Sequence, residues 1–298
     1  MASSLRDKLT SGAFVMTAEV TPPLSADPAE LLEKALPLQG YADAVNVTDG
    51  ASARAHLDSM VSALFLKQNG IEPILQVTCR DRNRIALQSE LVGAAALGLS
   101  NVLVLTGDDP KQGDQPDAKP VFDLDSTNLI TTIAHIRDQG ELLHGRKVGG
   151  RPDYFIGAAD APIDPPDGWA PKSLLKKVEA GAQFAQTQFC MDTGVVRRYL
   201  ARLAEHGLAG KLHYLVGVAP LASARSARWM KEKLFGVVIP DWIVDRMEKA
   251  SDAKAEGQAI AVEILNELKE IPGVSGAHLM APLNESAIPA VIDKVRKG

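Results

Sequence analysis

Short runs of apolar and β-branched residues recur along the whole chain, and their length predicts strands rather than helices. Nearly continuous apolar character over five to seven residues is typical of a strand that is buried on both faces. The eight runs are residues 14–20, 44–48, 73–78, 101–106, 154–158, 184–189, 212–218 and 274–280.

The segments between these runs show a helical pattern, with apolar residues at positions i, i+3 and i+4. The clearest are residues 53–67, 84–97, 126–137, 172–182, 193–206 and 254–269. Eight strands that alternate with helices favour a closed parallel barrel. We therefore predict an α/β fold, a single-domain (β/α)8 TIM barrel over residues 1–298. An open doubly wound sheet needs a glycine-rich loop after its first strand, and EVTPP at residues 19–23 is not one.

Composition narrows the class of protein without changing the predicted fold. The length of 298 residues suits one barrel, and the net charge of −5 gives no basic surface for nucleic acid. No apolar run approaches the roughly 18 residues that span a bilayer. Cys79 and Cys190 are far apart and lack a nearby second ligand, so neither a disulfide nor a metal site is expected. We expect a cytoplasmic protein that binds neither nucleic acid nor membrane.

The active site of such a barrel lies at the carboxyl ends of its strands. Two long irregular segments, residues 107–122 and 161–171, follow the fourth and fifth strands there, and long loops of this kind are usually functional. Glu19 and Asp108 end the first and fourth strands, so two carboxylates converge on one mouth. Asp108 is equally suited to a turn or a helix cap, whereas Glu19 precedes two prolines and cannot cap an immediate helix.

Five motifs at these strand ends together resemble the methylenetetrahydrofolate reductase family in order and spacing. The resemblance covers nearly the whole catalytic barrel and implies a short bacterial form, since nothing similar to the eukaryotic regulatory domain follows. The motifs are AEVTPP at 18–23, VNVTDG at 45–50, LTGDDP at 105–110, KKVEAGA at 176–182 and TQF at 187–189.

This resemblance implies an oxidoreductase of one-carbon metabolism and methionine biosynthesis. Such an enzyme moves hydride from NAD(P)H through a flavin to 5,10-methylenetetrahydrofolate and gives 5-methyltetrahydrofolate. Glu19 matches the glutamate that assists protonation of the folate, and general acid catalysis is typically worth about 10² to 10⁴-fold. Asp108 matches the aspartate whose charge stabilises the developing iminium ion. Gln188 matches a glutamine that hydrogen-bonds the folate and, on alternate turnovers, the nicotinamide.

The resemblance also implies FAD as the cofactor, with FMN or no flavin as alternatives. The residues that match flavin contacts are Thr48, Thr106, Gly107, Asp108, Lys177 and Lys176, the lysines at the phosphate end. The expected flavin lies across the rim formed by Thr48, Gly107, Asp108 and Lys177. Some positions depart from the family pattern, with Thr106 in place of an arginine and Gln76 in place of a histidine.

Several questions stay open at the level of the sequence. Arg80, Arg82 and Arg84 either replace lost phosphate contacts or begin a solvated helix. A folate-binding, flavin-poor subunit of a redox complex is an alternative to the reductase, and so is an enzyme that runs in the oxidative direction. The preference for NADH or NADPH and the number of subunits in a homo-oligomer are also open. None of the six histidines lies at a nucleophile-like motif, and we expect no catalytic role for any of them.

Overall fold

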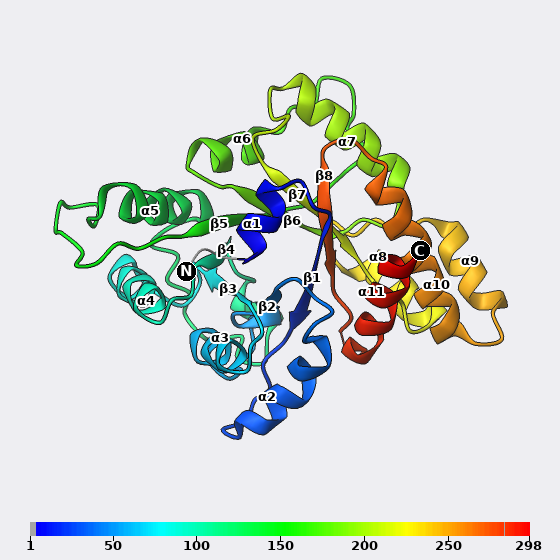
Figure 1. Ribbon diagram of the computed structural model, residues 1–298, viewed down its shortest axis with the longest axis horizontal. Coiled ribbons are helices and arrows are strands. Elements are labelled where there is room, and N and C mark those ends of the chain that lie inside the picture. The colour runs from blue at the N-terminus through cyan, green and yellow to red at the C-terminus, as the bar shows by residue number, and fades with distance from the viewer. Residues whose placement is uncertain (1–3, 283) are drawn as a thin grey trace.

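The barrel is built from eight parallel strands that follow one another in chain order around a closed ring (Figure 1). The computed structural model describes residues 4–282 and 284–298. The strands in these residues are β1 (Val15–Val20), β2 (Val45–Val47), β3 (Pro73–Thr78), β4 (Asn101–Leu105), β5 (Phe155–Asp160), β6 (Phe184–Phe189), β7 (His213–Val218) and β8 (Val274–Leu279). Each lies within two residues of its predicted bounds, so the predicted barrel is confirmed.

Strand β1 closes the ring because it pairs with β2 on one side and with β8 on the other. Ala18 lies opposite Val45 of β2, while Val15 lies opposite Gly276 of β8. A sheet that closes in this way leaves no edge strand with unpaired backbone groups. The carboxyl ends of all eight strands therefore share one rim.

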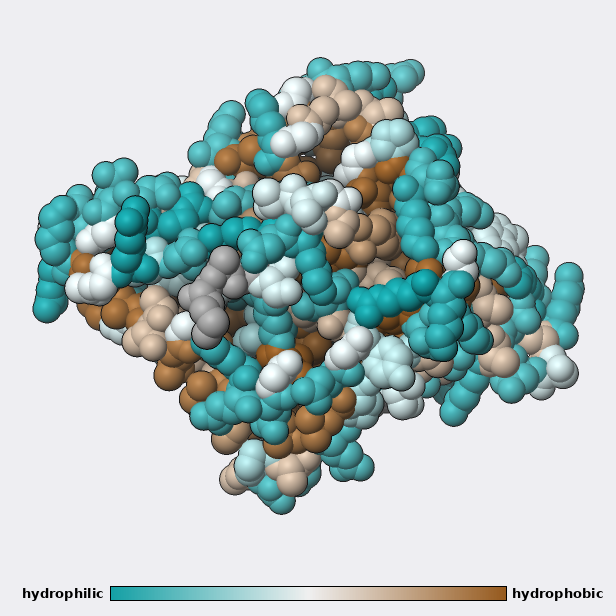
Figure 2. Space-filling model, in the orientation of Figure 1, coloured by the Kyte–Doolittle hydropathy of each residue, from teal (hydrophilic) through white to brown (hydrophobic). Residues whose placement is uncertain are grey.

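Helices cover the sides and one end of the barrel, and Figure 2 shows many hydrophilic residues on the surface of that end. They are α1 (Ser4–Thr10), α2 (Pro28–Ala35), α3 (Ser59–Gln68), α4 (Arg84–Ala96), α5 (Ser126–Gln139), α6 (Lys172–Glu179), α7 (Thr193–Glu205), α8 (Ala224–Lys233), α9 (Asp241–Lys249), α10 (Ala253–Lys269) and α11 (Ile288–Lys297). Four 3-10 turns are η1 (Leu36–Leu38), η2 (Ala51–Ala53), η3 (Pro110–Gln112) and η4 (Glu285–Ala287). No described helix combines the length and apolar character needed to cross a bilayer.

Two predicted helix boundaries are wrong, and the local backbone explains the larger error. The helix expected from residue 53 begins six residues later, where the Asp58 carboxylate caps α3 by accepting from the Val61 amide. Ser52 and Ala53 have φ angles of 56° and 54°, which an α-helix does not allow. The helix expected to reach residue 182 ends at Glu179.

The interior of the barrel is apolar at its amino-terminal end and polar near the rim. Leu5 and Leu9 of α1 pack into a buried cluster with residues of the strands, including Phe155 and Phe184, whose rings stack 4.9 Å apart. Helix α1 lies over the centre of the ring in Figure 1 and closes that end. Because apolar side chains and α1 fill the amino-terminal end, a ligand can reach the polar groups inside the barrel only from the opposite, carboxyl end.

Candidate active site at the carboxyl ends of the strands

A chain of buried hydrogen bonds crosses the inside of the barrel. Asn46 of β2 and Gln186 of β6 exchange two side-chain hydrogen bonds of 2.6 and 3.1 Å. The Gln186 amide also donates to Thr17 Oγ1 of β1 at 3.0 Å, and Thr17 Oγ1 lies 3.0 Å from Nδ1 of His278 on β8. All four residues are at most 3% exposed. Buried polar groups that are satisfied in this way hold one another in fixed orientations.

The Thr17 hydroxyl connects β1 to β8 in this network. Its oxygen accepts from the Gln186 amide, lies 3.0 Å from Nδ1 of His278 and lies 3.4 Å from the Ala277 carbonyl. With one proton and two lone pairs, this hydroxyl links Gln186 to both the side chain and the main chain of β8.

Glu19 lies next to this network on the side of the carboxyl ends of the strands. The amide of Gln76 on β3 donates to Oε2 of Glu19 at 2.9 Å, and Nε2 of His278 lies 3.6 Å from the same oxygen. The Glu19 side chain is 21% exposed, and no described residue hydrogen-bonds its Oε1. One oxygen of this carboxyl group is thus held by the protein and the other is available to a ligand.

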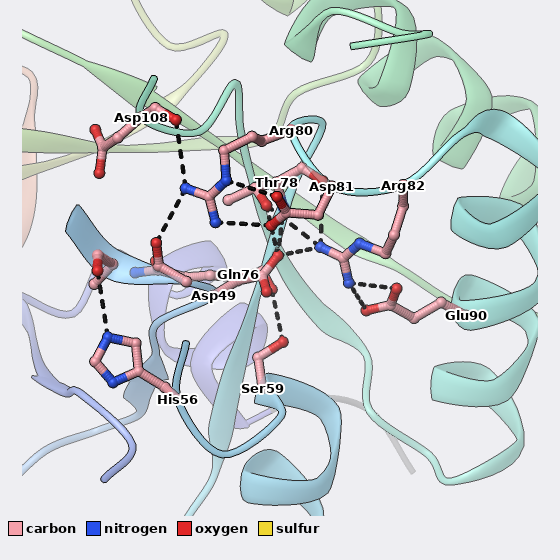
Figure 3. A network of polar contacts seen from close by, with 12 residues as sticks. Asp49, His56, Ser59, Gln76, Thr78, Arg80, Asp81, Arg82, Glu90 and Asp108 are labelled. Atoms are coloured by element: carbon pink, nitrogen blue, oxygen red, sulfur yellow. Dashed lines mark hydrogen bonds and ion pairs between the residues drawn. The ribbon is translucent and has the colours of Figure 1, made fainter. Parts of the chain in front are cut away.

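The loop after β4 carries Asp108 and requires a glycine. Gly107 has a φ of +93°, and an added Cβ would lie 2.9 Å from Cβ of Arg80 and 3.2 Å from Cβ of Thr78. The Asp108 carbonyl accepts from Arg80 at 3.4 Å, and Figure 3 shows the Asp108 carboxylate pointing away from that arginine. This carboxylate is exposed and accepts no hydrogen bond within the described residues, and its charge contributes to the raised pKa of Arg80. No hydrogen bond joins it to Glu19 in the described residues.

Thr48 follows β2 and is buried without a partner. It is 4% exposed, and its Oγ1 makes no hydrogen bond in the described part of the chain. A buried hydroxyl without a partner costs roughly 1–3 kcal/mol, which a bound ligand can recover. Thr106 is exposed, and its hydroxyl lies 3.4 Å from Ser126 Oγ, so it is oriented only weakly.

A cluster of ion pairs beside these residues includes Arg80, Arg82 and Arg84, whose role the sequence left open. Arg82 lies between the carboxylates of Asp49 and Glu90 (Figure 3). Burial raises the pKa of Glu90 above its ordinary value, and Arg82 opposes this rise. Asp49 Oδ2 also accepts from the amide and hydroxyl of Thr78, each at 2.8 Å.

Arg80 and Arg84 are ion-paired as well. Arg80 Nη2 lies 2.7 Å from Asp81, and Arg84 Nε lies 2.8 Å from Asp123. The three guanidinium groups therefore bind carboxylates of this chain, which favours a structural role over phosphate binding. A cleft of about 400 Å³ opens above Arg80 and Arg82, between the loops after β2 and β4.

The two lysines expected at the flavin phosphate differ in their surroundings. Lys177 Nζ donates to the carbonyl of Ala159 at 2.6 Å, and burial lowers the pKa of this lysine while nearby Asp160 opposes the shift. Lys176 is exposed, and no described residue pairs with its ammonium group. Of the two lysines, Lys176 therefore has the ammonium group that is more available to a ligand.

Gln188 is the penultimate residue of β6 and lies at the same rim. Its Oε1 accepts from the amide of Phe189 at 3.0 Å, and its Nε2 donates to the carbonyl of Phe235 at 3.3 Å. The latter bond is long and exposed, so a ligand can compete for this amide.

Three residues of the network escaped sequence analysis. His278 was expected to have no catalytic role, Gln186 was not singled out, and Gln76 was noted only as a departure from the family pattern. The available signal was a polar residue in the middle of an otherwise apolar strand, which must find a partner inside the barrel.

Both cysteines are free and buried, and burial raises the pKa of each thiol to about 12. Within the described residues, no three His, Cys, Asp or Glu side chains gather in a way that would hold a metal ion.

Comparison with known proteins gives a consistent result. The sequence profile described as "Methylenetetrahydrofolate reductase" matches residues 4–296. A 5,10-methylenetetrahydrofolate reductase of Pectobacterium carotovorum is 23% identical over 275 residues, which cover 90% of this chain and 85% of that protein. The Escherichia coli K12 reductase is 24% identical over 240 residues, covering 78% and 74%.

Other relatives are longer or more distant. The probable NADPH-dependent reductase of Caenorhabditis elegans is 26% identical over 243 residues, covering 78% of this chain but 34% of its own length. The chain thus spans about a third of that relative. A solved structure of a Clostridium thermocellum protein, described as binding two copies of 5-methyl-5,6,7,8-tetrahydrofolic acid, superimposes with a TM-score of 0.67 at 15% identity. It covers 98% of each chain, and at this identity it shows the fold.

Proposed function

The chain belongs to the methylenetetrahydrofolate reductase family, and from this premise we propose that it reduces 5,10-methylenetetrahydrofolate to 5-methyltetrahydrofolate. NAD(P)H is the proposed electron donor and FAD the proposed cofactor. The observation that carries the proposal is the Glu19 carboxyl group, with one oxygen held by Gln76 and the other free at the rim. Binding alone has little need for a carboxyl group that is held in this way.

Glu19 is the proposed general acid. Opening the five-membered ring of the substrate requires a proton on its leaving nitrogen, N10. The Gln76 amide donates to Oε2 of Glu19, which favours Oε1 as the oxygen that carries a proton on this group. Oε1 is the oxygen that no described residue binds, which supports its access to the substrate.

Asp108 is the proposed electrostatic partner of the reaction. Ring opening produces an iminium cation, and a fixed negative charge near it lowers the barrier. The Asp108 carboxylate is exposed in the loop after β4, and the hydrogen bond from Arg80 goes to the Asp108 carbonyl rather than to the carboxylate. Gln188 is the proposed contact for the folate and the nicotinamide, because a ligand can displace the long, exposed hydrogen bond of its side-chain amide.

The residues at the rim fit a flavin ring. The unpartnered Thr48 hydroxyl offers a hydrogen bond, and Gly107 lets the loop after β4 lie close to Arg80 and Thr78. We propose that Thr48, Thr106, Gly107 and Asp108 contact the ring end and that Lys176 contacts the phosphates. Lys177 fixes α6 by donating a hydrogen bond to the Ala159 carbonyl, and it reaches the cofactor only if this hydrogen bond breaks. When bound, the flavin supplies the hydride.

We also propose that the protein works in the cytoplasm as a homo-oligomer. Two free buried thiols fit a reducing compartment. The solved relative that binds 5-methyltetrahydrofolate supports folate as the ligand.

A flavin-poor, folate-binding subunit is the second candidate, and the engagement of Lys177 with Ala159 favours it. The visible spectrum of the purified protein separates the two. A flavin absorbance that NAD(P)H abolishes and methylenetetrahydrofolate restores supports the proposal of a reductase. A colourless protein that binds folate supports the second candidate, and a protein that does neither overturns both. Faster turnover from 5-methyltetrahydrofolate would instead favour the oxidative direction.

A further inference from the structure

The cleft beside Arg80 holds none of the groups that we propose to act in the reaction. Its volume is about 400 Å³, and residues of the loops after β2, β3 and β4 line it. Arg80 lies between this cleft and Asp108, because its Nη1 donates to the carbonyls of Gly50 and Asp108 at 3.1 and 3.4 Å (Figure 3). A long ligand that lies at Asp108 can therefore extend past Arg80 into the cleft.

The loop after β2 is held in place where it borders this cleft. Ala53 has a positive φ of 54°, and its carbonyl packs against Gly113 of the loop after β4, where an added Cβ would collide with that oxygen. Four residues further along, the Leu57 amide donates to the Pro23 carbonyl at 2.8 Å. Unfavourable backbone conformations of this kind cluster at ligand sites. Here the anchored residues on both sides fix the backbone of Arg54.

Arg54 contributes an unpaired positive charge to the lining of the cleft. The other two arginines that line it bind carboxylates of this chain, and the Asp58 carboxylate caps α3. Arg54 is exposed, and no carboxylate among the described residues pairs with its guanidinium group. A guanidinium group of this kind is suited to bind a phosphate through two parallel hydrogen bonds.

The rest of the lining suits the flat base of a nucleotide. Leu57, Pro110 and Ala118 are apolar, and Gln115 supplies a side-chain amide that can hydrogen-bond the edge of a base. Small-molecule sites typically have volumes of about 300–1,000 Å³ and combine apolar walls with a few polar groups. The cleft therefore has the size and the chemistry for a nucleoside that carries a phosphate.

We propose that the cleft binds the adenosine half of NADPH and that Arg54 binds its 2′-phosphate, so that the protein prefers NADPH to NADH. The inference rests on the proposed function, since it names the electron donor of that reaction. The flavin phosphates are assigned to Lys176 on α6, which leaves Arg54 for another anion. An arginine that accommodates the 2′-phosphate is a common basis for selecting NADP over NAD.

The test is calorimetric titration of 2′,5′-ADP, which carries the 2′-phosphate, and of 5′-AMP, which lacks it, into the purified holoprotein. We expect Arg54→Gln to raise the Kd of 2′,5′-ADP about tenfold, the lower end for a hydrogen bond between charged groups, and to leave that of 5′-AMP unchanged. The ratio of kcat/KM for NADPH to that for NADH should fall by a similar factor. Arg146→Gln is the matched control, since Arg146 is also exposed but precedes β5 at the amino-terminal end of the barrel, and it should change neither value.

The outcomes separate this inference from the proposed function. A natural protein that reduces the folate equally well with NADH and NADPH, or binds 2′,5′-ADP no more tightly than 5′-AMP, overturns the inference alone. Equal weakening of both nucleotides in Arg54→Gln also overturns the phosphate contact. If Arg54→Gln weakens 5-methyltetrahydrofolate instead, the arginine binds the folate carboxylates and the inference is wrong. A natural protein that reduces the folate with neither donor overturns the proposed function and the inference with it.

Discussion

The side-chain amide of Gln76 donates a 2.9 Å hydrogen bond to Oε2 of Glu19, across the inside of the barrel from β3 to β1. Nε2 of His278 lies 3.6 Å from the same oxygen. Because the Gln76 amide donates to one oxygen only, the two oxygens of Glu19 have different tasks. Oε2 fixes the side chain, and Oε1 is free for chemistry.

Replacing Glu19 by glutamine should separate the two halves of the proposed reaction. The amide is nearly isosteric, so the fold and flavin content should be retained. Reduction of the flavin by NAD(P)H needs no acid at the folate and should continue. The folate half-reaction should fall by roughly 10² or more. Stopped-flow absorbance follows each half, and equal losses in both, or none with folate, would remove Glu19 from the acid role.

Gln186→Leu should destabilise the protein, because Gln186 is 3% exposed and bonded to Asn46 and Thr17. Leucine has a similar size but leaves the partner groups unsatisfied, at a cost of about 2–3 kcal/mol. Urea denaturation measures this loss. Gln188→Leu is the matched control on the same strand, and its half-buried position predicts a change within about 0.5 kcal/mol. Equal losses in the two variants would contradict the importance of the buried network.

Gln188→Ala should weaken folate binding with most of the fold intact. One neutral hydrogen bond to the ligand is worth about 0.5–1.5 kcal/mol, or roughly two- to twelvefold in Kd. Titration with 5-methyltetrahydrofolate gives the Kd, and thermal unfolding reports on the fold. An unchanged affinity would count against the assignment of Gln188 to the substrate.

Arg82→Met and Arg84→Met should differ in stability although both remove an ion-paired arginine. Arg82 is 18% exposed and serves two carboxylates, Asp49 and Glu90, so its loss leaves both charges partly buried. The expected cost is on the order of 3 kcal/mol. Arg84 is 45% exposed and water screens its pair with Asp123, so its loss should change the stability little. Similar denaturation midpoints for the two variants would contradict a structural role for Arg82.

His213 should make the protein less stable at mildly acidic pH. Burial beside Phe155 lowers the pKa of His213 below its ordinary value, so the folded state favours the neutral ring. As pH falls below about 6.5, the unfolded chain takes up this proton first and stability decreases. His213→Gln should flatten the dependence of the urea midpoint between about pH 7.5 and 5.5. The exposed His144→Gln is the control, and an identical slope in the natural protein and both variants would refute the effect.

The sequence by itself determined the barrel. Residues 73–78 and 184–189 were predicted with the bounds that β3 and β6 have, because a buried parallel strand is a local apolar run. Helix α3 was placed too early, since Asp58 caps it and the positive φ values at Ser52 and Ala53 leave no trace in hydrophobic periodicity. Glu19 and Asp108 were recognised as rim residues because strand order alone places strand ends on one face.

Only the tertiary structure decided which side chains meet. Thr17 and His278 are 261 residues apart in sequence and pair because β1 closes onto β8. The partners of Arg82 follow from how the loop after β2 and helix α4 pack beside β3. The sequence alone therefore left the role of this arginine open. Local patterns encode the period of a strand or helix, whereas hydrogen-bond partners depend on register and closure. The elements could therefore be predicted from the sequence, but the network that holds Glu19 could not.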